Sequence, residues 1–434
     1  MRIVMFSLIS LSFVITVFSY VPLGKAIDNG VRINCKIKNS ILESRIIEID
    51  HKIKKYNRYF TIKGSGSYLY RSKKVEIKLP DMKTERGGIG SGLKIPGGTN
   101  HTYDIGVSVY QPIFTGNILS GLIRLNEYKK DINVNRKEFI ELMLRGSIKR
   151  IFFNYRMLTK QLESIEILEK KIRNHFNRLE DLFGEGLIEK REILETKLKL
   201  REVLLSKEKI GNSKNSLSSM FKELTDYDIK DIEKNYSESI EDLETSRGLF
   251  ILNHPKLRIL SAQKKIISMS KKINKGKNLP QIGSFAEFHY GLPGINFLGK
   301  EWNSYFQGGI NIKINVFDWG KVGKEDAIYN YNIEKVDNDK KDVIRKIRLK
   351  LSQLFKSLKS LKEQADIFKE MIGISKEELE LKKMMFEEKQ ISNKDYLDVV
   401  FNVEKRQSLR EQTILQIELV KVEINTMIGR KGGK

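Results

Sequence analysis

A unit made of one short strand and one very long helix occurs twice in this sequence. In the second copy, residues 306–316 alternate between apolar or glycine positions and polar ones, which is typical of a strand with two faces of opposite polarity. The apolar residues of the following helix recur at steps of three and four, as in a coiled coil. Phe114 corresponds to Phe317, with 317 − 114 = 203, and the same shift places Phe183 on Phe386 without a gap. This duplication constrains the fold more than the length does, which alone would predict about three domains.

The apolar seams of the two long helices keep one register. Under the shift, the seam positions Leu144, Ile148, Ile151, Tyr155, Leu158, Leu162 and Ile165 fall on Ile347, Leu351, Leu354, Leu358, Leu361, Ala365 and Phe368. The second long helix, predicted over 320–386, would measure about 100 Å. It needs partners, for which we expect 391–427 and 39–56 stacked end to end. The second of these has an apolar side with Ile41, Ile46, Ile49 and Ile53.

The duplication predicts two similar repeats. We expect a first repeat over 27–226, with a helix, strands 61–70 and 103–113, a long helix 115–183 and a return helix 187–224. A connecting region 227–250 leads to a second repeat over 251–429, with a helix, strands 281–290 and 306–316, a long helix 320–386 and a return helix 391–427, before a basic tail 430–434. The fold class is therefore mainly α with a small β part: long antiparallel coiled-coil hairpins plus four strands.

The repeats differ most in the loop between their strands. Residues 71–102 form a loop of 32 residues, whereas its counterpart, 291–305, has 15. Glycines crowd 87–92, but no Gly-Lys-Ser/Thr and no helix follow them, so a phosphate-binding loop is disfavoured. We expect both loops at exposed tips of the molecule, where insertions collect.

The N-terminus predicts export. Residues 1–26 begin with Met-Arg, continue with an apolar run and end in a small-x-small pattern at Gly24 and Ala26, as in a secretory signal peptide. We expect cleavage near Ala26; a retained membrane anchor is the alternative. Cys35 is the single cysteine, so an intramolecular disulfide is excluded. It lies well past the apolar run, which disfavours lipidation without deciding the question.

Composition disfavours an enzyme and a nucleic-acid-binding protein. The formal net charge is +24, but Lys and Arg are mixed with Asp and Glu along the helices, which is typical of a solvated coiled-coil surface. The five His lie at no metal-ligand spacing, and neither a nucleophile elbow nor a dinucleotide fingerprint occurs. We predict no catalytic, cofactor or metal site.

Four two-faced strands cannot close a barrel alone, because membrane barrels need at least about eight strands. Three copies would supply twelve, with the Tyr-containing apolar face toward lipid and the polar face toward water, the latter with Gln307, Asn311, Lys313, Asp104 and Ser108. The alternative is a soluble pair of hairpins packed on helices.

The chain resembles the TolC-like outer-membrane efflux factors over nearly all of its mature length. The resemblance rests on the stretches 110–116, 183–187, 316–320 and 395–398, on their order in the chain and on the offset of 203 between the two repeats. It implies a homotrimer in outer-membrane lipid, with a twelve-stranded barrel and a periplasmic helical tunnel. It also implies docking to a periplasmic adaptor and an inner-membrane pump, with no chemistry of its own.

The resemblance also assigns roles to single residues. The strand-to-helix corners would lie at Pro112, Phe114, Phe317 and Gly320, and the adaptor-contact tips at Gly184, Gly186, Leu187 and Lys389. Two positions depart from the family pattern. Asn315 replaces a Pro before the corner, and Lys389 replaces a tip glycine, which puts the second adaptor contact in doubt.

Two carboxylates three positions apart follow the second tip. Asp395 and Asp398 can project to one side of a helix. The resemblance implies that aspartates at these positions line the closed periplasmic gate. Glu192, 203 positions before Asp395, is the corresponding residue of the first repeat. Three copies would place six carboxylates around one axis. From the residues alone, the favoured interpretation is that of first-turn carboxylates that complement a helix N-terminus.

These features predict a passive exit duct of a tripartite export system in the outer membrane, for efflux of drugs or secretion of proteins. A periplasmic coiled-coil adaptor or structural protein is the alternative.

Overall fold

The computed structural model describes residues 20–78, 82–83, 89–90, 94–240, 253–296 and 299–430. Its residues form two compact units. The helical unit comprises Met1–Asn39, Lys137–Pro255 and Val343–Lys434, and the sheet unit comprises Ser40–Arg136 and Lys256–Asp342. Most residues of the predicted signal peptide, 1–19, and residues 431–434 of the tail lie outside the described part.

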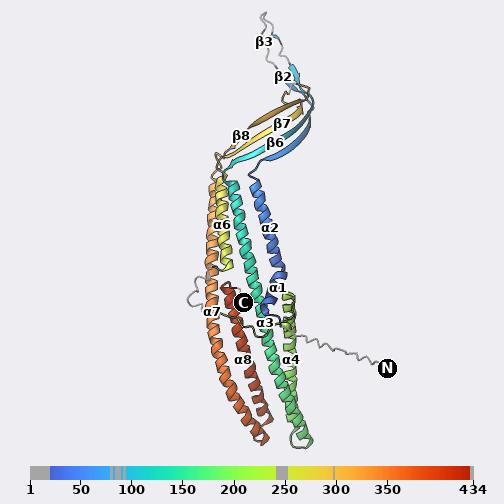
Figure 1. The fold of residues 1–434 in the computed structure, drawn as a ribbon, viewed down its shortest axis with the longest axis vertical. Coiled ribbons are helices and arrows are strands. Elements are labelled where there is room, and N and C mark those ends of the chain that lie inside the picture. The colour runs from blue at the N-terminus through green and yellow to red at the C-terminus, as the bar shows by residue number, and fades with distance from the viewer. Residues whose placement is uncertain are drawn as a thin grey trace, which may run out of the picture. The chain divides into compact units, whose positions relative to one another are not determined.

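The two long helices repeat at an offset of 203 residues, and their ends lie one to three residues from the predicted bounds 115–183 and 320–386. Helix α3 (Ile118–Gly184) and helix α7 (Lys321–Glu387) both have 67 residues, and both of their ends differ by 203 (Figure 1). The return helices are α4 (Lys190–Thr225) and α8 (Asn393–Met427). The first helices of the repeats also match, because α2 (Cys35–Tyr56) and α6 (Pro255–Gly276) both have 22 residues. Here the shift is 255 − 35 = 220, and the extra 17 residues equal the difference between the two strand-connecting loops.

The helical unit has an aromatic core where α1 (Leu23–Ile33) packs on α3 and α4. Its fully buried residues include Leu23, Ala26, Phe152, Phe153 and Phe221. Backbone bonds join Val21 to Asp231 and Glu233, next to the short helix η1 (Ile229–Asp231). The predicted cleavage near Ala26 would therefore cut inside α1 and remove part of this core.

The connecting region is attached to the helical unit by a buried ion pair. Lys149 Nζ lies 2.8 Å from Glu238 Oε2, and both side chains are buried. Asn425 Nδ2 donates to Glu238 Oε1 at 2.7 Å, and the Tyr236 hydroxyl donates to Oε2 at 2.6 Å. Residues 236–238 of the connecting region thus pack between α3 and α8. Residues 241–252 lie outside the described part.

Each long helix has its own partners, which corrects one expectation. In the sheet unit, α2 packs on α3, where Asn133 Nδ2 donates to the Ser40 carbonyl at 2.7 Å and Asn126 Nδ2 to Asp50 Oδ2 at 2.7 Å. Helix α6 lies along α7, with Lys264 Nζ 2.7 Å from Asp337 Oδ2. Within the single chain, residues 39–56 do not partner the second long helix as expected, because these polar contacts place them on the first.

The isoleucine side of α2 is exposed in the single chain. We expected Ile41, Ile46, Ile49 and Ile53 to cover a long helix, but all four are exposed, whereas Ser40 and Ile47 are buried. The face of α2 that packs within the chain is therefore its mixed polar face.

A four-stranded antiparallel sheet forms in the order β1-β6-β7-β8 (Figure 1). The strands are β1 (Thr61–Tyr70), β6 (His101–Thr115), β7 (Gln281–Leu292) and β8 (Asn303–Lys313). Strands β6 and β7 come from different repeats, so their pairing joins the two predicted hairpins into one sheet.

Strand β8 lies three residues earlier than the predicted 306–316. It pairs with β7 from Asn303 opposite Gly291 to Lys313 opposite Gln281. Because β7 begins at Gln281, Ile314 and Val316 lie beyond the end of the ladder.

The loop 71–102 contains more regular structure than we expected. Strand β2 (Val75–Lys78) pairs with β5 (Lys94–Gly97), and β3 (Met82–Lys83) pairs with β4 (Ile89–Gly90). The remaining glycine-rich residues 84–88 and 91–93 lie outside the described part.

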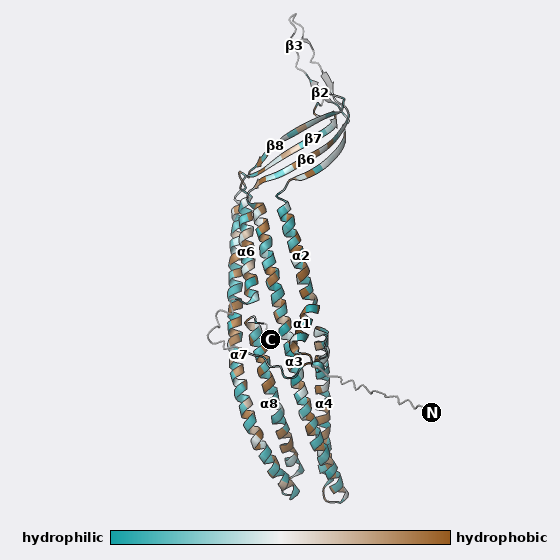
Figure 2. Ribbon diagram, in the orientation of Figure 1, coloured by the Kyte–Doolittle hydropathy of each residue, from teal (hydrophilic) through white to brown (hydrophobic). Residues whose placement is uncertain are grey.

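The sheet has two faces of opposite polarity, as predicted. Cross-strand register places apolar residues of all four strands on one face, where they are exposed: Ile62, Tyr68, Ile105, Val107, Phe288, Tyr290, Phe306, Ile310 and Ile312. The opposite face carries polar residues, among them Ser65, Asp104, Glu287, His289 and Gln307. Alternation of side chains along each strand produces both faces, and the hydropathy colours vary accordingly along the strands (Figure 2).

Within the described ranges, no helix is both long and apolar enough to cross a membrane.

Candidate functional site

The turns that connect α3 to α4 and α7 to α8 have the same backbone geometry. In the first, Gly186 has φ 74°, and its N–H donates to the Phe183 carbonyl at 2.9 Å. In the second, Lys389 has φ 58°, and its N–H donates to the Phe386 carbonyl at 3.0 Å. A further bond spans five residues in each turn, from Leu187 to Leu182 and from Gln390 to Met385. Both turns are therefore Schellman caps, and Lys389 adopts the left-handed conformation that glycine favours.

This geometry shows in what respect the second tip departs from the first. Lys389 departs from glycine in residue type but not in backbone conformation. Leu187 and Lys389 are both exposed, as are Gly184 and Gly186 at the first tip. Their contact with an adaptor stays a prediction.

A buried histidine joins the helices of the helical unit just above the tips. His175 Nε2 on α3 lies 2.5 Å from Asn393 Oδ1, at the start of α8. Asn393 Nδ2 donates to Thr196 Oγ1 at 3.0 Å and to the Glu192 carbonyl at 3.4 Å, both on α4. His175 and Asn393 therefore link α3, α4 and α8 through a single polar chain.

Aromatic contacts bring α7 into the same cluster. The His175 ring lies 5.3 Å from the Phe386 ring and 5.0 Å from the Tyr396 ring, between ring centres. Phe386 and Tyr396 stack at 5.2 Å. Beside them, Arg178 Nη1 lies 3.4 Å from Glu387 Oε1. Phe386 thus packs between helices, whereas its counterpart Phe183 is exposed.

Burial changes the proton affinity of this histidine. Desolvation lowers the pKa of His175 below its ordinary value of 6.5; the bond to Asn393 opposes this change, and the positive charge of Arg178 adds to it. At neutral pH, the uncharged imidazole is therefore the favoured form of His175 in the folded tip.

The predicted gate carboxylates lie on the exposed surface of α8. Asp395 and Asp398 are both exposed, and their spacing places them on one side of the helix. The N–H of Asp395 donates to Ser392 Oγ at 3.1 Å, and the Ser392 hydroxyl donates to Asp395 Oδ2 at 2.6 Å. This reciprocal cap lowers the pKa of Asp395. In the single chain Asp395 therefore caps its own helix, and its role in a gate stays a prediction.

Glu192 reaches the tip cluster through its backbone. Its carbonyl accepts from Asn393 Nδ2, and its own side chain is half-buried in the first turn of α4. Its pairing with the aspartates in a closed gate stays a prediction. Among the described residues, no group of acidic, His or Cys side chains is arranged to hold a metal ion.

The strand-to-helix corners also repeat at the 203 offset. Gly116 and Asn117 have φ 61° and 65°, and Trp319 and Gly320 have φ 56° and 72°. In the first repeat a bulge lies between Pro112 and Phe114 and the strand continues to Thr115. In the second, Phe317 and Trp319 lie exposed with ring centres 5.0 Å apart. The missing Pro at Asn315 accompanies an earlier end of the strand, but the helix starts at the same relative position.

Sequence reasoning identified the tips and the acidic pair but missed His175 and Asn393. Neither has a counterpart of its own type 203 positions away, and they lie far apart in the chain. No local pattern could have paired them.

Searches with protein-family models found no match to this sequence. No curated protein matched it either. Solved structures do match. One is a structure of CusC, solved to describe conformational changes that accompany folding and transmembrane channel formation. It matches with a TM-score of 0.77 at 11% identity, and the match covers 95% of this chain and 93% of the CusC chain. The CmeC outer membrane channel of Campylobacter jejuni has a TM-score of 0.74 at 14% identity and covers 95% of this chain and 86% of its own. The outer membrane protein VceC of Vibrio cholerae has a TM-score of 0.74 at 12% identity, covering 95% and 96%. The predicted resemblance is therefore confirmed at the level of the fold.

Proposed function

We propose that this chain is one protomer of a trimeric exit duct in the outer membrane. Three features support the proposal: the fold it shares with outer-membrane channels, the two-faced sheet, and an exposed apolar side on α2. The two-faced sheet is the observation that carries it.

The sheet is incomplete in one chain. Its outer strands β1 and β8 each have one edge without a partner strand among the described residues. Every residue of β1 is exposed, including Ile62 and Tyr68. An edge of this length with a large exposed apolar face favours pairing with another chain. In a trimer, β8 of each copy would pair with β1 of the next. The twelve strands would then form a closed barrel with its apolar face toward lipid.

Aromatic residues gather at the loop end of the apolar face. Tyr103 lies 5.1 Å from Tyr68 and 5.9 Å from Trp302, and Trp302 lies 5.0 Å from Tyr290, between ring centres. Outward aromatic girdles mark the interfaces of membrane barrels. This cluster fits a position at the headgroups of the outer leaflet.

The exposed side of α2 fits a second copy of this chain. Leu42, Ile46, Ile49, Ile53 and Tyr56 follow one another at steps of four and three, and all are exposed. This is the spacing of a coiled-coil seam. Helix α2 leads into β1 and α7 follows β8, so pairing β8 of one copy with β1 of the next would bring α7 toward α2. The start of α7 exposes Ile328 and Tyr331, which could meet this seam.

The duct would work without chemistry of its own. Its helix tips would close the periplasmic entrance, where three copies of Asp395 and Asp398 would form a ring of six carboxylates. A periplasmic adaptor and an inner-membrane pump would open the tips, and the pump would select the cargo.

Single-channel recording in a planar bilayer tests this function. The purified protein should run as a trimer and show a small, cation-preferring conductance. Replacing Asp395 and Asp398 by Asn should reduce the cation preference, while Glu388→Gln, at the exposed turn outside the ring, should leave it unchanged. A monomer that conducts nothing would contradict the proposal.

A periplasmic adaptor or structural coiled coil is the competing function, since long helical hairpins serve that role too. Membrane fractionation separates the two. The duct should sediment with the outer membrane as a detergent-resistant trimer, and the adaptor should not.

A further inference from the structure

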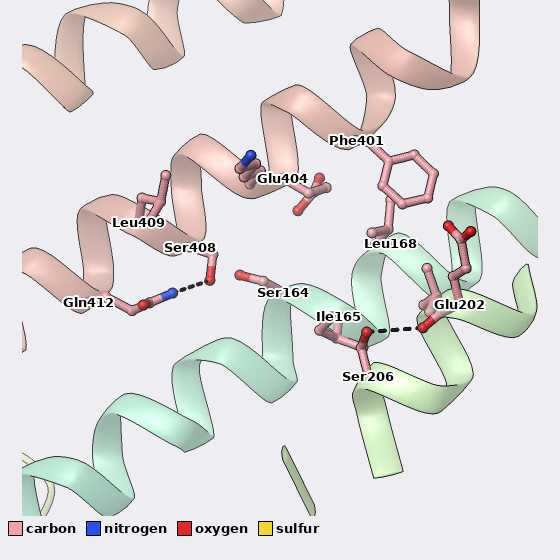
Figure 3. Close-up of a pocket in the computed structure, with 12 residues that line it drawn as sticks. Ser164, Ile165, Leu168, Glu202, Ser206, Phe401, Glu404, Ser408, Leu409 and Gln412 are labelled. Carbon is pink, nitrogen blue, oxygen red and sulfur yellow. Dashed lines mark hydrogen bonds between the residues drawn. The ribbon is translucent and has the colours of Figure 1, made fainter. Parts of the chain in front are cut away.

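A pocket of about 350 Å³ opens between α3, α4 and α8 in the helical unit (Figure 3). One side is apolar, with Ile165, Leu168, Val203, Phe401 and Leu409. Ser164, Ser206 and Gln412 supply polar groups. The lining of the pocket includes neither His175 nor the tip carboxylates Asp395 and Asp398.

One buried carboxylate in the pocket has an oxygen that no described residue engages. Glu404 on α8 is only 4% exposed. Its Oε1 accepts from Lys171 Nζ at 2.7 Å, but its Oε2 is buried and accepts no hydrogen bond from the part of the chain that the structure describes. A buried charged acceptor without a donor costs free energy, so a ligand that supplies a donor would be stabilised here.

The neighbouring polar groups are engaged elsewhere. The Ser206 hydroxyl donates to the Glu202 carbonyl at 2.9 Å, and Gln412 Nε2 donates to Ser408 Oγ at 3.0 Å (Figure 3). Both donors are therefore used within their own helices. A bound molecule could supply the donor that Glu404 Oε2 lacks.

Both carboxylates beside the pocket have a lysine partner, but Glu404 Oε2 accepts no hydrogen bond within the described residues. Lys171 pairs with Glu404, and Lys199 Nζ lies 3.4 Å from Glu202 Oε2. Lys171 is 42% exposed and occupies only one oxygen of Glu404. At the edge, Lys199 Nζ lies 5.4 Å from the centre of the Phe401 ring, so this ring already accepts a cation on its face.

We infer that this pocket binds a small amphipathic primary amine. The ammonium would donate to Glu404 Oε2, and the apolar body would cover Leu168, Val203 and Phe401. A charged donor suits a carboxylate better than a neutral hydroxyl, since charge-assisted hydrogen bonds are roughly twice as strong. The volume lies at the lower end of the range for small-molecule sites. This inference is independent of the proposed export function.

Calorimetric titration of the full-length protein tests the inference, with a detergent blank for each compound. The probes are 2-phenylethylammonium, the neutral 2-phenylethanol and the anionic 3-phenylpropanoate. The amine should bind at least about tenfold more tightly than the alcohol, and the anion should not bind, since only the amine carries a charge-assisted donor.

Three variants separate charge from shape. Glu404→Gln should weaken amine binding at least about tenfold and reduce its advantage over the alcohol, since the charge is lost. Ser206→Phe, which fills the pocket but leaves Glu404 in place, should abolish binding of both. Glu208→Gln is the matched control, because this exposed carboxylate on the same helix α4 does not line the pocket, and the variant should bind the amine as the wild type does. Thermal melting checks that each variant folds. If Glu404→Gln does not fold, the loss of amine binding in Ser206→Phe tests the site instead. Equal affinity for amine and alcohol, or wild-type binding by either pocket variant, would overturn the inference.

Discussion

His175 Nε2 and Asn393 Oδ1 lie 2.5 Å apart, although 218 residues separate them in the chain. This hydrogen bond joins α3 to the first turn of α8 inside the helical unit. It lies among the aromatic rings of Phe386 and Tyr396, where water has little access. The bond makes the protonation state of one histidine relevant to the structure of the tips.

The tips should become less stable in acid. Burial lowers the pKa of His175 below 6.5, so below pH 6.5 the unfolded chain takes up a proton that the folded tip disfavours. The stability contributed by neutral His175 is full above pH 6.5. It falls by about 1.4 kcal/mol for each pH unit between the pKa of the unfolded chain and that of the folded tip. Hydrogen exchange of the tip amides at pH 7.5 and pH 5 measures this loss. In His175→Gln the tip should lose most of this pH dependence, and an unchanged dependence would contradict the assignment.

Glycine at position 389 should stabilise the second hairpin. Lys389 has φ 58°, a conformation that costs a residue with a side chain about 1 kcal/mol and costs glycine little. Lys389→Gly should therefore raise the free energy of unfolding by up to about 1 kcal/mol, and Gly186→Ala in the first turn should lower it by a similar amount. Chemical denaturation measures both. Destabilisation by Lys389→Gly would show that the lysine side chain makes a stabilising contact.

An alanine at position 276 should disturb the corner of the sheet unit. A Cβ on Gly276 would meet the Gly116 carbonyl oxygen at 2.3 Å, closer than atoms approach without movement of the backbone. We expect Gly276→Ala to cost about 1–3 kcal/mol. Gly323→Ala is the matched control, since it also lies in a helix of this unit and has nothing within 4 Å; it should be neutral or stabilising by up to about 1 kcal/mol. Equal melting temperatures for the two variants would contradict the close approach.

Charge on the two faces of the sheet should have different effects on membrane assembly. Ile310 lies on the apolar face and is exposed, while its neighbour Asn311 points to the opposite face. If the apolar face meets lipid, Ile310→Arg should cost about 2–4 kcal/mol and reduce the amount of outer-membrane trimer. Asn311→Arg should leave the trimer intact. Gel analysis of extracted membranes compares them, and equal trimer yields would argue against lipid contact.

Local patterns in the sequence were enough to establish the duplication and most of the secondary structure. Phe114 and Phe317 set the shift of 203 residues, and α3 and α7 obey it at both ends. Helix periodicity and strand alternation are properties of neighbouring residues, so they can be predicted without knowledge of the fold. The two faces of the sheet could be predicted for the same reason.

Which of these elements meet became clear only in the folded chain. The pairing of β6 with β7, the three-residue displacement of β8 and the contact of α2 with α3 all depend on partners far away in the chain. The same holds for the bond between His175 and Asn393 and for the buried oxygen of Glu404. A local pattern records which face of an element is apolar, but not what covers that face. For this reason the sequence predicted an apolar side on α2, and only the folded chain showed that this side is exposed.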